Sequence, residues 1–94
     1  MMLKENAPSF AMGRLTAMPA ALEAVPRKEI FQALGRCITC DWGDLSDADK
    51  RRNDHALKTG ERLLSEYHSL NGTRFWIITE ADRSATTVLL PEDY

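Results

Sequence analysis

The dipeptide Asn71-Gly72 constrains the fold of this chain more than any other short stretch. It separates two apolar and aromatic runs, residues 63–69 and 73–79. Asn-Gly between such runs is the strongest local signal for a β-hairpin with a type I′ turn, because both central residues of that turn need positive φ angles. The sequence therefore predicts two antiparallel strands that are joined at Asn71-Gly72.

The hairpin is expected to continue into a third strand. Apolar side chains occupy both alternating faces of the second arm at residues 75–78, which is typical of a central strand. After a turn at residues 80–83, the run 84–90 contains the Thr and Val residues that favour strands, and Pro91 ends it. The C-terminal third thus predicts a three-stranded meander.

The upstream sequence predicts one more strand and the first of three helices. Residues 10–17 are short and moderately apolar, which favours a strand. Pro19 suits the first turn of a short helix to Ala24, and Pro26 can open a second helix that ends near Cys40. The apolar residues of the second helix follow helical spacing and are predicted to form its buried face: Ile30, Phe31, Leu34 and Ile38.

A third helix is predicted over residues 47–59. Ser46 is a good N-cap, and Asp49 three residues later gives an arrangement like a capping box. Gly60 is the natural end of the helix. Asn53 lies in the middle of this helix, where Asn has poor propensity, so its amide is expected to reach across to the preceding loop or to the sheet.

These elements are expected to form one domain. The chain has 94 residues with 44% hydrophobic content, which is enough for one core but not for two. We predict an α+β domain at residues 10–94, in which an antiparallel sheet of three to four strands, the N-terminal strand plus the C-terminal meander, packs against two to three helices. Residues 1–9 carry few apolar side chains and are predicted to be a flexible N-terminus.

The composition narrows the classes of partner. The chain carries 12 Lys and Arg against 14 Asp and Glu, and its formal charge of -2 provides no broad cationic field for a nucleic-acid backbone. No apolar run approaches the roughly 18 residues that cross a bilayer, and the first ten residues have no signal-peptide core. We therefore predict a cytoplasmic protein that does not bind membranes.

Cys37 and Cys40 have the C-x-x-C spacing of redox pairs and of zinc half-sites. A redox pair usually sits where a strand feeds a helix, whereas this pair ends a predicted helix. A zinc site would need His55 and His68, which are too far apart in sequence for the usual ligand spacing. We interpret both cysteines as ordinary thiols and predict no metal and no cofactor.

The first candidate site is the turn at residues 80–83 together with Arg74 on the preceding strand. Glu80 and Asp82 near the guanidinium groups of Arg74 and Arg83 could support acid–base chemistry or hold a metal-bound phosphate. The alternative is a solvated hairpin tip, because Asp and Arg are ordinary turn residues and surface ion pairs contribute at most about 1 kcal/mol. Since no nucleophile accompanies them, we interpret these four residues as a partner-binding tip.

Trp42 is the second candidate. It lies in the loop Asp41-Trp42-Gly43-Asp44, where an exposed indole would offer an aromatic platform to a partner. A buried indole would instead fill the core between two helices, and burial is the favoured interpretation of this residue.

The third candidate is the basic run Lys50, Arg51 and Arg52 on the third predicted helix, with Lys58 and Arg62 nearby. Such a patch could contact phosphates although the whole chain is acidic. Acidic residues are interleaved with it, and charge runs of this kind are usually a solvated helix face. Nucleic-acid binding through these residues is therefore the alternative rather than the leading hypothesis.

Several stretches carry a recognisable pattern: Gly72-Thr73-Arg74, Trp76 to Ser84, Leu89 to Tyr94, Asp41-Trp42-Gly43, Asn53, Ala56-Leu57, Gly60 and Arg62 to Ser65. In these stretches the chain resembles a family of small uncharacterised bacterial proteins that are described as plasmid-related. The resemblance covers most of the chain beyond Phe10. It implies a context, the mobile genetic elements of bacteria, but no reaction. Family members carry a glycine where this chain has Cys40, which makes the C-x-x-C look incidental.

The leading hypothesis is a non-enzymatic accessory protein of a mobile genetic element that binds another protein. Exposed strand edges could also pair in a homodimer. The alternatives are a small nucleic-acid-binding protein, acting through the basic run and Arg74, and a small hydrolase or nuclease that uses Glu80 and Asp82.

Overall fold

The computed structural model of the protein describes residues 9–94 and confirms the α+β class. The elements are, in chain order, β1 (Arg14–Ala17), α1 (Pro19–Ala24), α2 (Arg27–Ile38), α3 (Asp47–Thr59), β2 (Leu63–His68), β3 (Arg74–Thr79), β4 (Ala85–Leu89) and a 3-10 turn at Pro91–Asp93. Of the N-terminus predicted to be flexible, residues 1–8 lie outside the described range. The N–H of Ser9 donates to the Ile38 carbonyl at 2.8 Å. Within residues 9–94, no helix is long and apolar enough to cross a membrane.

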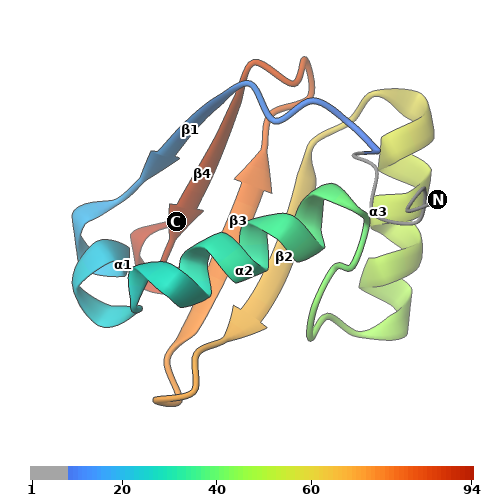
Figure 1. The fold of residues 1–94 in the computed structure, drawn as a ribbon. Helices are drawn as coiled ribbons and strands as arrows, with labels where there is room; N and C mark the ends of the chain where they lie inside the picture. The colour runs from blue at the N-terminus through green and yellow to red at the C-terminus, as the bar shows by residue number, and fades with distance from the viewer. Residues whose placement is uncertain (1–8) are drawn as a thin grey trace, which may run out of the picture.

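The four strands form one sheet in the order β1-β4-β3-β2 (Figure 1). The meander is confirmed, because β2 pairs with β3 and β3 pairs with β4, both antiparallel. The predicted wholly antiparallel sheet needs a correction, since β1 runs parallel to β4. Between β1 and β4 the chain passes through three helices and a hairpin, and this long excursion allows β4 to arrive in the same direction as β1.

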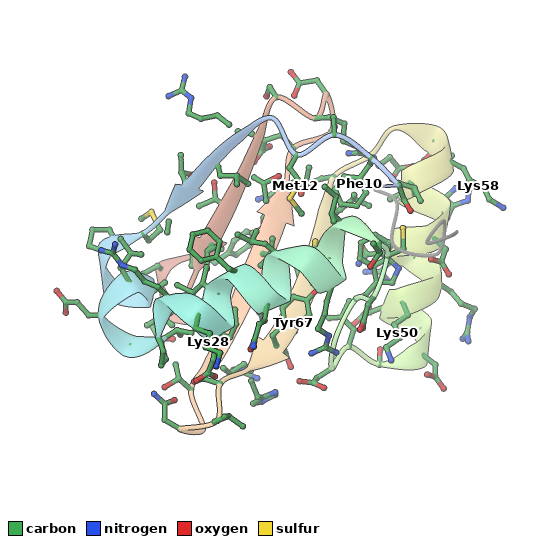
Figure 2. The ribbon with its side chains drawn as sticks, in the orientation of Figure 1. Phe10, Met12, Lys28, Lys50, Lys58 and Tyr67 are labelled. Atoms are coloured by element: carbon green, nitrogen blue, oxygen red, sulfur yellow. The ribbon has the colours of Figure 1, made fainter. Side chains whose placement is uncertain are left out.

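The helices cover one face of the sheet. Figure 1 shows α2 crossing in front of the strands, with α1 on the side of β1 and α3 on the side of β2. Strand residues that alternate toward α2 are buried, and they include Leu63, Tyr67, Phe75, Ile77 and Val88. Tyr67 lies next to α2 (Figure 2), and the Arg36 guanidinium of that helix lies 5.0 Å from the centre of its ring. The core is therefore the layer between the helices and the sheet.

The buried face of α2 differs in part from the prediction. Ile30 and Leu34 are buried as expected, but Phe31 is 67% exposed. Ala33 and Cys37 complete the buried stripe, because the helix presents positions i, i+3, i+4 and i+7 to the sheet. Phe31 therefore lies beside the core and not within it.

The termini of α3 follow the prediction. The Ser46 hydroxyl accepts a hydrogen bond from the Asp49 N–H at 3.1 Å, and Gly60 ends the helix in the left-handed conformation. The first strand is shorter than predicted and begins at Arg14. Gly13, just before it, has a φ of +66° and lies so close to the Ser84 carbonyl that a side chain there would clash.

The hairpin between β2 and β3 is confirmed, but its turn is not type I′. Gly72 has a φ of +90°, whereas Asn71 is not among the non-glycine residues with positive φ. Ser69 pairs with Thr73 across a three-residue loop, and the Gly72 N–H donates to the Ser69 carbonyl at 2.9 Å, which is a type I turn with a glycine bulge. The Asn71 amide donates to the Ala24 carbonyl at 3.0 Å, and its oxygen accepts from the Thr73 N–H. These contacts hold Asn71 out of the type I′ geometry.

Candidate functional site

The predicted partner-binding tip is divided by the fold. Arg74 is the first residue of β3, whereas Glu80, Asp82 and Arg83 follow the end of that strand. A strand rises about 3.3 Å per residue, so Arg74 and the turn lie at opposite ends of the sheet, roughly 20 Å apart. The four residues therefore do not share one surface.

Arg83 has a structural role that the sequence did not indicate. Its Nη1 donates to the carbonyls of Glu61 at 2.7 Å and Glu80 at 2.9 Å, and its Nη2 donates to the Ala56 carbonyl at 3.4 Å. The guanidinium thus lies at the negative end of α3 and ties the β3–β4 turn to it. Arg83 has a positive φ of 61°, which is unusual for a residue other than glycine. This conformation is a property of the folded backbone, so the sequence did not reveal it.

The two carboxylates of the predicted tip are exposed, and Asp82 stabilises the turn. The Asp82 carboxylate accepts a hydrogen bond from the Ser84 N–H at 3.0 Å. Hydrogen bonds from Ser84 lower the pKa of Asp82 below its ordinary value. This environment keeps the carboxylate ionised, which does not favour Asp82 as a general acid at neutral pH.

Trp42 lies in the core. It is 3% exposed, its Nε1 donates to the Asp54 carboxylate at 2.9 Å, and its ring stacks on Phe10 with the centroids 6.1 Å apart. The indole therefore packs as the favoured interpretation expected, and it offers no exposed platform.

The basic run on α3 lies beside acidic groups. Arg51 and Arg52 are exposed and Lys50 is half-buried, and Figure 2 shows Lys50 and Lys58 on this helix. Arg52 lies 3.8 Å from the Asp49 carboxylate. The same two residues line a groove of about 290 Å³ whose other residues include Glu66 and Trp76. The carboxylates of Asp49 and Glu66 offset the positive charge of Arg52, which disfavours phosphate binding at this groove.

The surroundings of the cysteines do not favour metal or redox chemistry. Cys37 is fully buried, and its Sγ lies 3.5 Å from the Ser65 hydroxyl. Burial raises the pKa of the Cys37 thiol, which is opposite to the shift of a reactive cysteine. Within the described range no three His, Cys, Asp or Glu side chains gather as a metal site. His68 pairs instead with Asp44 at 2.8 Å.

The chain itself covers one edge of the sheet at Leu64 and Glu66. Along β2, the Asn53 amide donates to the Leu64 carbonyl at 2.6 Å and its oxygen accepts from the Leu64 N–H at 3.2 Å. Two residues further, the Asp44 N–H donates to the Glu66 carbonyl at 2.7 Å, and the Glu66 N–H donates to the Trp42 carbonyl at 3.3 Å. Asn53 thus reaches the sheet, as one of the two predicted possibilities, and occupies the place of a neighbouring strand.

The opposite edge is open. Arg14 and Met18 donate their N–H groups to carbonyls of the β4 segment, at 3.0 and 2.8 Å. Because backbone groups alternate along a strand, the N–H and C=O of Leu15 and Ala17 point away from β4. Figure 1 shows β1 at the outer edge of the sheet, and within residues 9–94 only β4 pairs with it. The open edge is therefore formed by Leu15 and Ala17.

An apolar groove lies beside this open edge. Its volume is about 280 Å³ and its walls come from β1, α1, α2 and β4: Leu15, Thr16, Ala17, Leu22, Arg27, Ile30, Phe31, Leu34 and Val88. Three of these side chains are well exposed, Leu15 at 52%, Leu22 at 41% and Phe31 at 67%. Among the described residues that line it, Arg27 alone is charged. We call Leu15, Ala17 and this groove the β1 edge site.

Comparison with protein-family models, with curated proteins and with solved structures finds no match to this chain. The resemblance to plasmid-related proteins therefore stays a prediction. Sequence analysis missed the β1 edge site because the exposure of Leu15, Leu22 and Phe31 depends on how the helices sit on the sheet.

Proposed function

We propose that the protein is a cytoplasmic, non-enzymatic interaction module that binds an extended segment of a protein chain at the β1 edge site by strand addition. The resemblance to plasmid-related proteins suggests that it acts as an accessory protein of a mobile genetic element. The observation that carries the proposal is the combination of an unpaired strand edge with an exposed apolar groove beside it.

The backbone of β1 supplies the general part of the binding. Leu15 and Ala17 each present an N–H donor and a C=O acceptor to an incoming strand, in the pattern that strand-addition domains use. Main-chain hydrogen bonds of this kind provide affinity without regard to the sequence of the segment. The open edge therefore defines the conformation of the partner, which must be extended.

The groove supplies selectivity. Side chains of an added strand alternate, so every second one lies on the side of α1 and α2, where Leu22, Phe31 and Leu34 form an apolar wall. Arg27 at this wall favours a carboxylate over an ammonium group. The preferred segment has apolar side chains at alternating positions and an acidic residue near one end.

Two observations disfavour the other hypotheses. The Arg83 guanidinium is engaged with backbone carbonyls, and Asp82, one of the two carboxylates of the hydrolase alternative, caps its own turn. Arg52 of the basic run lies beside Asp49 and lines a groove with Glu66. Neither surface combines exposure, apolar area and unpaired backbone as the β1 edge site does.

Selection from a displayed library of random peptides on the immobilised protein tests the proposal. We expect enriched peptides with alternating apolar residues, and two-dimensional NMR should show that they shift the amides of Leu15 and Ala17. Ala17→Pro removes one outward N–H and leaves the bonds to β4 in place, because Pro is tolerated on edge strands. It should abolish peptide binding while the protein stays folded.

Leu70→Lys is the matched control, because Leu70 is 95% exposed but lies at the β2–β3 hairpin tip, away from the groove. It should leave peptide binding unchanged. Peptides that bind Ala17→Pro as well as the wild type, or that shift amides elsewhere, would refute strand addition at β1.

A further inference from the structure

We infer that the extended segment taken up by the β1 edge site is β1 of a second copy, so that two chains pair antiparallel about Thr16 and form one continuous sheet. This inference rests on the proposed function and names its partner. It follows from the register of β1, from the side chains around it and from the covering of the opposite edge.

The backbone of β1 is complementary to itself. When Thr16 lies opposite Thr16 of the second copy, Leu15 lies opposite Ala17 of the second copy. Leu15 and Ala17 are the two β1 residues whose N–H and C=O point away from β4, so they form a hydrogen-bonded pair on each side of the two-fold axis. The arrangement is isologous, as closed dimers require.

The side chains fit this register. Leu15 and Ala17 pair with Thr86 and Val88 of β4, which places them on the helix side of the sheet. The exposed side chains of Leu22 and Phe31 flank the same junction from both copies. Pairing would therefore cover an apolar surface that is exposed in the single chain.

The other face of the sheet presents no charge conflict along β1. Arg14, Thr16 and Met18 lie on that face by alternation. The register puts Arg14 opposite Met18 of the second copy, and the two Thr16 side chains meet at the axis. No like charges lie directly opposite one another along the paired strands, which would otherwise oppose the association.

The opposite edge is largely covered, which directs pairing to β1. Asn53 and the segment Trp42–Asp44 occupy the outward backbone groups of Leu64 and Glu66, two of the three β2 residues that face outward. In the part of the chain that the structure describes, the sheet thus has one edge that the chain covers at Leu64 and Glu66 and one edge that is left for another strand. Because the contact between the two β1 strands is isologous, association through it stops at the dimer and does not continue into a fibre.

Analytical ultracentrifugation of the full chain over a wide concentration range tests the inference. The weight-average mass should rise with concentration from 10.6 kDa toward twice that value. Ala17→Pro, which removes one intermolecular donor from each copy, should weaken dimerisation by roughly tenfold or more. Leu70→Lys should leave the dimerisation constant unchanged.

A crosslinking experiment tests the register. In an antiparallel pair without direct hydrogen bonds the Cα atoms are about 4.5 Å apart, within the roughly 4.4 to 6.8 Å that a disulfide spans. In a Cys40→Ser background, where Cys37 stays buried, Thr16→Cys should form a covalent dimer under mild oxidation. Leu70→Cys, exposed at the hairpin tip, should crosslink far more slowly.

The outcomes separate this inference from the proposed function. A chain that stays monomeric and fails to crosslink through Thr16→Cys, yet binds selected peptides at β1, refutes the second copy as the partner and leaves strand addition standing. A chain that neither associates nor binds peptides refutes both. A dimer that is unaffected by Ala17→Pro uses another surface and also overturns the inference.

Discussion

Replacing Asn53 with alanine should destabilise the protein strongly, because Asn53 joins α3 to the edge of the sheet. Asn53 is 5% exposed, and its side chain makes two hydrogen bonds to the backbone of Leu64 on the edge strand β2, at 2.6 and 3.2 Å. Asn53→Ala removes both partners at once. The Leu64 N–H and C=O then face α3 with nothing to bind.

The magnitude follows from opposing effects. Each lost hydrogen bond costs about 1 kcal/mol, and leaving two half-buried backbone groups unpaired adds about 1 kcal/mol more in total. Alanine returns about 0.5 kcal/mol through its better helix propensity. The free energy of unfolding should therefore fall by about 2.5 kcal/mol, which lowers the melting temperature of a domain of this size by roughly 10–20 °C.

Urea denaturation measures this loss, and His55→Ala is the matched control. His55 is exposed on the same helix and gains similar propensity on replacement by alanine, and within residues 9–94 its side chain makes no hydrogen bond to β2. It should change the unfolding free energy by less than about 0.5 kcal/mol. A loss below about 1 kcal/mol in Asn53→Ala, or an equal loss in His55→Ala, would refute the role assigned to Asn53.

Asn53→Asp separates hydrogen bonding from packing, because the new side chain has nearly the same shape. Its carboxylate still accepts from the Leu64 N–H but opposes the Leu64 carbonyl, so folding should raise the pKa of the introduced carboxyl group above its value in the unfolded chain. The stability that depends on the protonated form is present at low pH and is lost as pH rises through the raised pKa. In urea denaturation, the free energy of unfolding of Asn53→Asp should therefore lie closer to that of the wild type at acidic pH than at neutral pH. A difference between the two proteins that does not change with pH would contradict this account.

Three other perturbations test the rest of the fold. Gly43→Ala should lower the free energy of unfolding, measured in urea, by about 3 kcal/mol or more, because Gly43 has a φ of +76° and a Cβ there would overlap the Glu66 carbonyl. A loss below about 1 kcal/mol would contradict the close approach of Gly43 to Glu66. Arg83→Ala should lower the free energy of unfolding by about 2 kcal/mol, because the carbonyls of Glu61 and Glu80 lose a charged donor. Arg83→Lys should recover only part of this loss, because an ammonium group lacks the planar shape of the guanidinium. Full recovery by Arg83→Lys would contradict this role of the guanidinium. Hydrogen bonds from Ser69 and Leu70 lower the pKa of Glu29 in the folded state, so its contribution to stability is present above the ordinary glutamate pKa and is lost as pH falls through the depressed value. When the urea midpoint is measured as a function of pH, the midpoint of Glu29→Gln should therefore fall less at acidic pH than that of the wild type. An equal fall in both proteins would refute this assignment.

Local signals in the sequence predicted most of the elements. The hairpin was predicted by Asn71-Gly72 between two apolar runs, and α3 by Ser46 and Gly60 at its ends. These signals act over a few residues, so they work without knowledge of the rest of the chain. The same locality explains the error in the turn type, because the Asn71 amide binds the Ala24 carbonyl, which lies 47 residues away in sequence.

The candidate site was predicted less well than the fold. The sequence pointed to Arg74 and residues 80–83 because polar turn residues stand out in a sequence. Their separation follows from the length of β3, and the anchoring of Arg83 follows from contacts with Ala56 and Glu61. The exposure of Phe31 depends on the rotation of α2 against the sheet, which helical periodicity fixes only to within about one residue.

The sequence by itself determined the α+β class, the order of the elements and the expectation that Asn53 reaches out of its helix, because these depend on propensity, periodicity and capping. Only the tertiary structure decided that β1 lies parallel to β4, that Asn53 and the Trp42–Asp44 segment cover the β2 edge at Leu64 and Glu66, and that the β1 edge stays open. Those outcomes depend on pairings between residues far apart in the chain. Such pairings leave no local trace in the sequence, since the groups that make them are the same backbone N–H and C=O at every position.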